Sequence, residues 1–279
     1  MSGQATSRRS VSRELAVLVG LYLLYDAVRW LPAGEGARAH ADAHWILSAE
    51  RLAGVAIERS LQRALSFGAA SWTLACVYLA AQLLVLPGAL VWLYLRAPAI
   101  YRRLRDTVVA VWLLALPVFV LFPVAPPRLS EPGISDTVST HAPLPLTGGS
   151  TLFYNPYAAV PSLHVALAWA LGAALCAAAR RRALRIAAAL WGPLVTVAVI
   201  ATGNHYLFDV AGGLAVAVAG FWLSGARSGG SRALAGGHDR GARAGRQHLA
   251  GEGSDVIGAV VTATVDEERR RARHAAGVG

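Results

Sequence analysis

Long apolar stretches alternate with short polar segments along most of this chain. The apolar stretches fall at about 15–31, 70–95, 107–124, 160–179, 186–202 and 206–224. Each is close to the ~20 residues that an α-helix needs to cross a ~30 Å hydrocarbon layer. Two of them are short and rely on thinning of the bilayer. The pattern therefore predicts an all-α fold, a polytopic membrane bundle of about six transmembrane helices.

The first apolar stretch follows a short polar segment, residues 1–14, and allows two interpretations. It could be a signal peptide, because Ala39-His40-Ala41 resembles a small-residue cleavage site. However, Asp26 and Arg29 lie inside the stretch, which is unusual for the apolar region of a signal peptide, and the candidate cleavage site lies far beyond it. We therefore favour a retained membrane span.

The segment 33–68 is too polar to cross a membrane, but residues 42–67 have helical periodicity. Trp45, Leu52 and Ala56 can share one apolar face of such a helix. The charged residues occupy the remaining surface: Glu50, Arg51, Glu58, Arg59 and Arg63. The pattern predicts an outer amphipathic helix that lies in the membrane interface, and a packed helix of an external cap remains an equal alternative.

Arginine clusters lie between the second and third stretches, between the fourth and fifth, and after the sixth. They comprise Arg96, Arg102, Arg103 and Arg105; Arg180, Arg181, Arg182 and Arg185; and Arg227 and Arg232. The positive-inside rule places these clusters and the N-terminus in the cytoplasm. The loops 33–68, 125–158 and 203–205 then face outward. We expect a multi-pass protein of the cell membrane with both termini cytoplasmic.

Composition excludes several classes of function. Apolar residues make up 55% of the chain and charged residues only 15%, which is typical of multi-span membrane proteins. The net charge of +10 comes from short arginine clusters rather than from one basic face with aromatic residues, so we expect no nucleic-acid partner. Cys76 and Cys176 are too few and too far apart for a disulfide framework or a thiolate metal site.

The segment after Gly225 differs in composition from the rest of the chain. Residues 225–254 are mainly Gly, Ser, Ala and Arg, with too few large apolar residues to form a core. We therefore predict three parts. Residues 1–14 form a cytoplasmic N-terminus, residues 15–224 a six-helix transmembrane catalytic domain, and residues 225–279 a disordered cytoplasmic tail.

Two polar motifs stand at the outer ends of predicted helices. One is Pro161-Ser162-Leu163-His164, and the other is Asn204-His205-Tyr206-Leu207-Phe208-Asp209. Ser162 and Asn204 favour helix N-caps, and a helix N-terminus attracts phosphate through its N–H groups and dipole. We therefore expect two helix ends to form a phosphate site that involves Ser162 and Asn204.

The side chains in these motifs suit phosphoryl transfer. His205 and Asp209 are four residues apart, so on a helix the carboxylate can orient the imidazole and stabilise its cation. His205 could then attack phosphorus, while His164 protonates the leaving oxygen. Arg128, the only basic residue in the outer loop, is a candidate phosphate ligand. A metal site is the alternative, but no third closely spaced ligand supports it, and we predict no cofactor.

The paired motifs resemble the second and third motifs of the type 2 phosphatidic acid phosphatase superfamily, with the similarity clearest over residues 120–225. The resemblance is closer to the inositol phosphorylceramide synthase-like branch. The phosphatase branch has an arginine where this chain has Val199, a lysine-containing first motif where this chain has only Pro126-Pro127-Arg128, and often a glycine at Leu163. In the synthase-like branch, Pro-Ser-Leu-His and His-Tyr-x-x-Asp sequences are usual.

The resemblance implies a lipid phosphotransferase with His205 as nucleophile, Asp209 as its orienting group and His164 as acid and base. Such an enzyme moves a phospho-headgroup, for example inositol phosphate, from a phospholipid donor to the hydroxyl of a lipid acceptor. A lipid phosphate or polyprenyl diphosphate phosphatase is the alternative enzyme, and a non-enzymatic lipid transporter is the alternative of another class. The sequence does not define the oligomeric state.

Overall fold

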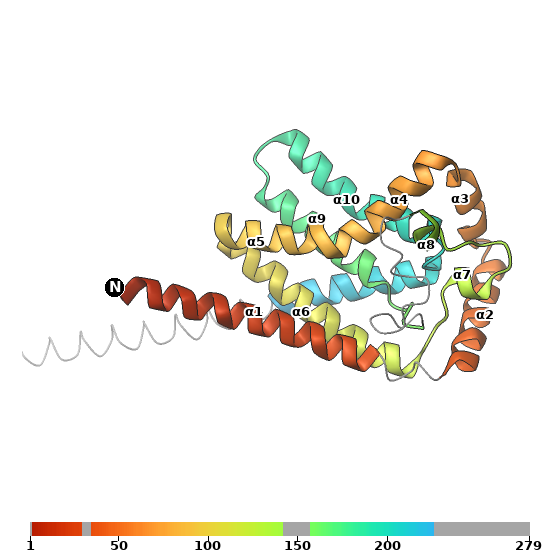
Figure 1. Ribbon diagram of the computed structural model, residues 1–279, viewed down its shortest axis with the longest axis horizontal. Helices are drawn as coiled ribbons and strands as arrows, with labels where there is room; N and C mark the ends of the chain where they lie inside the picture. Colours follow the sequence, from red (N-terminus) through yellow and green to blue (C-terminus); the bar gives the residue numbers. More distant parts are fainter. Residues whose placement is uncertain (1, 30–34, 142–156, 226–279) are drawn as a thin grey trace, which may run out of the picture. The chain divides into compact units, whose positions relative to one another are not determined.

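The computed structural model describes residues 2–29, 35–141 and 157–225 (Figure 1). The predicted tail lies outside these residues apart from Gly225. The labelled helices are α1 (Ser2–Arg29), α2 (Gly36–Leu52), α3 (Glu58–Leu65), α4 (Gly68–Ala80), the π-helical turn η2 (Ala81–Val85), α5 (Leu86–Arg96), α6 (Pro98–Leu121), α7 (Pro127–Ser130), α8 (Thr137–His141), α9 (Leu163–Ala178) and α10 (Arg182–Ala201). A last helix covers Leu207–Gly225. The described part of the chain is helical and contains no strand, which confirms the all-α class.

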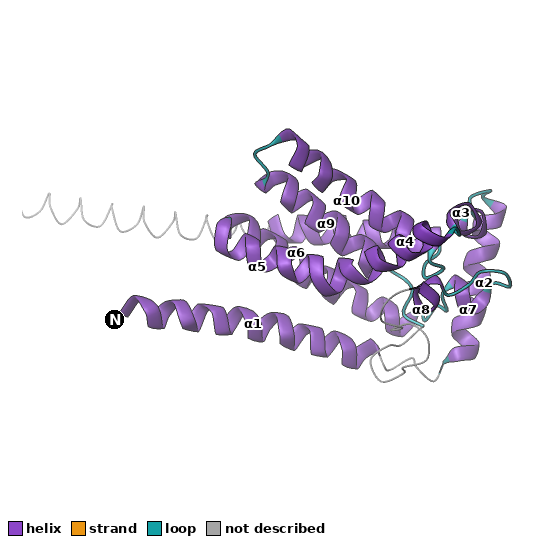
Figure 2. Ribbon diagram, turned by 45° about the horizontal axis from the view of Figure 1, so that its top comes forward, coloured by secondary structure: helices purple, strands orange, loops and turns teal. Residues whose placement is uncertain are grey.

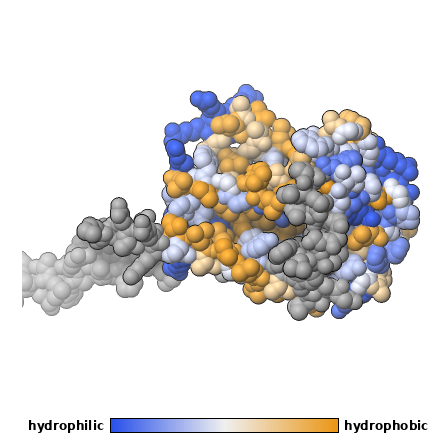
Figure 3. Space-filling view, viewed as in Figure 1, coloured by the Kyte–Doolittle hydropathy of each residue, from blue (hydrophilic) through white to orange (hydrophobic). Residues whose placement is uncertain are grey.

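Within the described residues, four helical segments are long and apolar enough to cross a membrane. They are Gly68–Arg96, Pro98–Leu121, Arg182–Ala201 and Leu207–Gly225, and they match four of the six predicted stretches. The fourth predicted stretch forms α9, which is apolar but has only 16 residues. Residues 15–29 of the first lie in α1, which is not among the four, so the count of six remains a prediction. Apolar side chains cover much of the bundle surface in Figure 3, which fits a membrane protein.

Helix α9 is at the centre of the bundle and packs against α6 and α10. Its residues Val165, Ala166 and Leu171 are at most 1% exposed. At Gly172 a methyl group would lie 2.8 Å from the carbonyl oxygen of Ala188, so α9 and α10 are in backbone contact there. Because α9 is held on several sides, the polar residues at its N-terminal end have a fixed place relative to the neighbouring helices.

The outer segment 42–67 differs from the prediction. It forms two helices, α2 and α3, because α2 ends at Leu52 and Gly54 follows with a positive φ of 71°. Glu50 and Glu58, which we expected on the solvated surface, are 4% and 1% exposed, so that expectation was wrong. Their burial favours the packed cap over the interfacial helix. Figures 1 and 2 show α2, α3, α7 and α8 together at one end of the bundle, and we call these four helices and their connecting segments the cap.

Candidate active site

His205 and Asp209 form a buried pair at the start of the last helix. The His205 Nδ1 atom lies 3.1 Å from Asp209 Oδ2, and the two residues are 6% and 0% exposed. The same Oδ2 atom accepts a hydrogen bond of 2.9 Å from the backbone N–H of Tyr206. The carboxylate therefore reaches back over its own first turn, as an acidic residue three positions after an N-cap does, and it fixes the orientation of the imidazole.

His164 lies at the N-terminal end of α9, beside this pair. Ser162 caps α9 as predicted, because its Oγ atom accepts a hydrogen bond of 3.4 Å from Val165 N. The His164 ring stacks on Tyr78 of α4, with ring centroids 4.1 Å apart and an interplanar angle of 18°. Its centroid is 6.2 Å from that of His205. The structure therefore brings the two histidines, far apart in sequence, within the reach of one phosphate group.

The two polar motifs meet through backbone contacts. The backbone N–H of Ser162 donates a hydrogen bond of 3.0 Å to the carbonyl oxygen of Asp209. One turn further along the last helix, a methyl group at Gly213 would lie 2.5 Å from the Ser162 carbonyl oxygen. Only a residue without a side chain permits this approach. The spacing between His164 and His205 is thus set by the backbone rather than by flexible side chains.

Asn204 does not cap the last helix, contrary to our expectation. The helix begins at Leu207, and the Asn204 side chain bonds instead to Thr202 Oγ1 at 2.9 Å and to Arg128 Nη1 at 2.9 Å. Carboxylates already bind the backbone N–H groups of the first turn. Tyr206 N donates to Asp209, Leu207 N donates to Glu58 at 2.9 Å, and Phe208 N donates to Glu50 at 2.7 Å. This helix end therefore does not offer those N–H groups to phosphate.

Arg128 holds the turn that precedes His205. Its side chain is 1% exposed, and its Nε atom lies 3.1 Å from Asp136 Oδ2. Its backbone N–H donates to the carbonyl oxygen of Gly203 at 2.9 Å, where φ is +73°. These contacts, together with the bond to Asn204, give Arg128 a structural partner on each side. A contact between Arg128 and substrate phosphate remains a prediction.

The cap places further acidic groups close to the pair. Burial is the main reason why the pKa of Glu50 is raised to about 8, with Glu58 and Asp209 adding to the effect. Burial also raises the pKa of Glu131, although Arg51 and Arg59 lie 3.8 and 3.9 Å from its carboxylate. No sequence pattern pointed to Glu50 and Glu58 at this site, because their partners in the last helix are about 150 residues away.

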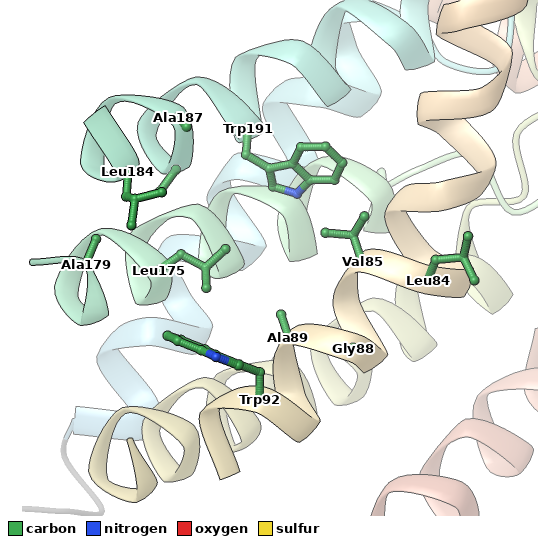
Figure 4. Close-up of a pocket in the computed structure, with 11 residues that line it drawn as sticks. Leu84, Val85, Gly88, Ala89, Trp92, Leu175, Ala179, Leu184, Ala187 and Trp191 are labelled. Atoms are coloured by element: carbon green, nitrogen blue, oxygen red, sulfur yellow. The ribbon is translucent and has the colours of Figure 1, made fainter. Parts of the chain in front are cut away.

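An apolar cavity of about 590 Å³ lies elsewhere in the bundle (Figure 4). Trp92, Leu175 and Trp191 line it, from α5, α9 and α10. Leu175 is eleven residues after His164, which is about 16 Å along a helix axis, so this cavity is separate from the histidines. Among the described residues, no group of three or more His, Cys, Asp or Glu side chains is arranged to hold a metal ion.

A family model described as the PAP2 superfamily matches residues 44–223, which include the second half of α2, the helices α3 to α10, and His164 and His205. The chain belongs to the PAP2 superfamily. Members of this superfamily are generally phosphatases or phosphotransferases, which supports an enzyme. The chain matches no curated protein and no solved structure at a significant level. The match supports the superfamily assigned from the motifs, whereas the synthase-like branch stays a prediction.

Proposed function

We propose that this PAP2 superfamily protein is a lipid phosphotransferase that moves a phospho-headgroup, such as inositol phosphate, from a phospholipid to a lipid hydroxyl. The observation that carries the proposal is the arrangement of His205, Asp209 and His164 around one point, with His205 Nδ1 held by Asp209 at 3.1 Å and the two imidazole centroids 6.2 Å apart. A carboxylate on one ring nitrogen makes the other nitrogen, Nε2, the nucleophile.

In the first half-reaction, Nε2 of His205 attacks the phosphorus of the donor phosphodiester. A P–N bond forms, and the P–O bond to the diacylglycerol breaks. The protonated His164 gives its proton to the leaving oxygen. Asp209 stabilises the positive charge on His205, because the carboxylate is buried beside it and the interaction is little screened.

In the second half-reaction, the hydroxyl group of the acceptor lipid occupies the place of the diacylglycerol. His164, now neutral, takes the hydroxyl proton while the acceptor oxygen attacks phosphorus. The P–N bond breaks, and His205 returns to its neutral form. Water in place of the acceptor lipid would hydrolyse the intermediate by the same steps and release the phosphorylated headgroup. A lipid phosphatase on the same scaffold would differ in its donor as well, which is a phosphomonoester or a diphosphate.

The charges around the pair favour a phosphodiester donor. Val199, at the position where the phosphatase branch has an arginine, is 0% exposed and lies in the apolar core. Arg128 is paired with Asp136 and bonded to Asn204. A phosphomonoester carries about two negative charges at neutral pH, whereas a phosphodiester carries one. A site with few available cations therefore suits the diester better.

The arrangement of charge along α9 supports an outward-facing site. His164 is at the N-terminal end of α9, and the arginines of 180–185 follow its C-terminal end. The 16 residues of α9 rise about 24 Å, which separates the histidines from the arginines by most of a hydrocarbon layer. With the positive-inside rule, we place the histidines on the extracytoplasmic side.

The test is incubation of the purified protein with a panel of head-group-labelled phospholipids, with and without hydroxylated lipid acceptors. We expect labelled headgroup on the acceptor, and an acid-labile, base-stable phosphoramidate on the protein when the acceptor is omitted. His205→Ala should remove both products, while His141→Ala, which changes an exposed histidine of α8, should keep them. Release of inorganic phosphate without acceptor would identify a phosphatase instead, and full activity of folded His205→Ala would refute the mechanism.

A further inference from the structure

Two buried glutamates from the cap bind consecutive N–H groups of the last helix. Leu207 N donates to Glu58 Oε1 at 2.9 Å, and Phe208 N donates to Glu50 Oε1 at 2.7 Å. Glu50 comes from the last turn of α2 and Glu58 from the first turn of α3. Because the donors are neighbours in one turn, the two carboxyl groups lie side by side, at the helix that carries Asp209.

Two ionised carboxylates in this position would repel each other, since burial removes the solvent that screens them. The second oxygen of Glu50, Oε2, is buried and has no hydrogen-bond partner among the described groups, which is unfavourable for a charged atom. One proton on Glu50 removes both problems. The neutral carboxyl can donate to Glu58 through Oε2, while Oε1 still accepts from Phe208.

We propose that Glu50 and Glu58 form a carboxyl pair that shares one proton, and that this pair positions His205 and Asp209 by holding the first turn of the last helix. Neither glutamate touches the reacting atoms in this scheme. Each acts through the backbone of Leu207 or Phe208, so both are positioning residues. The effect on activity rests on the proposed function, whereas the shared proton does not.

The charges around the pair support a single proton. Burial raises the pKa of Glu50 to about 8, and Glu58 and Asp209 act in the same direction. The Glu131 carboxylate is near enough to Glu58 to interact with it electrostatically, and it is itself close to Arg51 and Arg59. Glu50 is therefore mainly protonated at neutral pH. Its ionisation would add a second charge to the pair beside the Asp209 carboxylate.

This ionisation should loosen the first turn and misplace His205. Three consecutive N–H groups, of Tyr206, Leu207 and Phe208, are each bound by a carboxyl group. Repulsion within the pair acts directly on two of these bonds. A misplacement of about 1 Å at a reacting group lowers the rate by about 10²-fold, so we expect headgroup transfer to decline as the pH rises above about 8.

Two substitutions of Glu50 distinguish the effect of the proton from the effect of the side chain. In Glu50→Gln, the amide keeps an oxygen for Phe208 N–H and a permanent N–H donor for Glu58, so it imitates the protonated acid. We expect it to retain transfer at neutral pH and to have a smaller alkaline decline than the wild type, because only the part caused by deprotonation of His164 remains. Glu50→Ala removes both contacts and should lower kcat by about 10²-fold. An alkaline decline in Glu50→Gln equal to that of the wild type would overturn the proposal.

Difference infrared spectroscopy between about pH 6 and pH 10 detects the proton without any substrate. A protonated carboxyl group has a C=O stretching band that an ionised carboxylate lacks. We expect a band that loses intensity at high pH, is weaker in Glu50→Gln than in the wild type and keeps its wild-type loss of intensity in Glu131→Gln, the matched buried control. A pH-dependent loss of wild-type size in folded Glu50→Gln contradicts the shared proton. If no phospholipid is turned over by the wild type, the proposed function fails while this measurement still decides the inference.

Discussion

Gly213 sets the distance between the two histidine motifs, and Gly213→Ala should therefore damage catalysis more than folding. The added methyl group would lie 2.5 Å from the Ser162 carbonyl oxygen, whereas ordinary contacts begin at 3.4 Å. The last helix and the start of α9 must then separate by about 0.9 Å. The same movement stretches the bond of 3.0 Å between Ser162 N and the Asp209 carbonyl oxygen.

The size of the effect follows from this displacement. A shift of about 1 Å between reacting groups lowers the rate by about 10²-fold, so kcat for headgroup transfer should fall by one to two orders of magnitude. Overpacking destabilises a core by about 1–3 kcal/mol, but alanine is better than glycine in a helix by about 1 kcal/mol. We expect a net loss of stability between zero and about 2 kcal/mol, so the protein should remain folded.

Gly212→Ala is the matched control. A methyl group at Gly212 would lie 3.4 Å from Pro161 Cβ, which is an ordinary contact. Gly212→Ala changes the helix propensity by the same amount, at the adjacent residue, but does not push the last helix away from α9. The assay is headgroup transfer by both variants beside thermal unfolding in detergent. If Gly213→Ala and Gly212→Ala have the same kcat, the backbone contact does not set the catalytic geometry.

Two further predictions concern Tyr78 and Glu50. Tyr78→Phe keeps the ring that stacks on His164 and should retain most activity. Tyr78→Leu should lower kcat by about tenfold, since aromatic contacts contribute about 0.5–1.5 kcal/mol. Equal kcat values for the two variants would exclude a positioning role for the ring. The raised pKa of Glu50 means that the folded state holds a proton that the unfolded state has lost between pH 4.5 and about 8. Stability should therefore fall with rising pH in this window, by at most about 1.4 kcal/mol per pH unit, and thermal unfolding of Glu50→Gln should show a smaller slope than the wild type.

The sequence predicted those features that depend on local spacing. Ser162 caps α9 because a serine just before a helix can accept a hydrogen bond from an N–H group of the first turn. The contact between His205 and Asp209 follows from their separation of four residues. The apolar stretches gave the approximate bounds of the helices, since burial in the bundle requires long apolar segments. All of these signals lie within about one helical turn or one helix.

The features that sequence reasoning missed depend on contacts between distant segments. Asn204 has the residue type of an N-cap, but Arg128 and Thr202 compete for its side chain and the helix begins at Leu207. Glu50 and Glu58 have the pattern of a solvated face, and only the fold reveals that the last helix supplies their hydrogen-bond donors. A charged residue on an amphipathic helix is therefore a weak indicator of exposure when that helix covers another helix end.

The carboxylates at the start of the last helix change how the protein can attract its substrate. The positive end of a helix dipole favours an anion, but here Asp209 and the pair of Glu50 and Glu58 already occupy that position. Their negative charge opposes a second anion nearby, and the opposition grows with the charge of the phosphate group. A monoanionic diester is less affected than a dianionic monoester. In the proposed reaction, binding therefore relies more on the lipid chains and the imidazoles, which is consistent with a donor that stays in the membrane and with His205 as the group that attacks phosphorus.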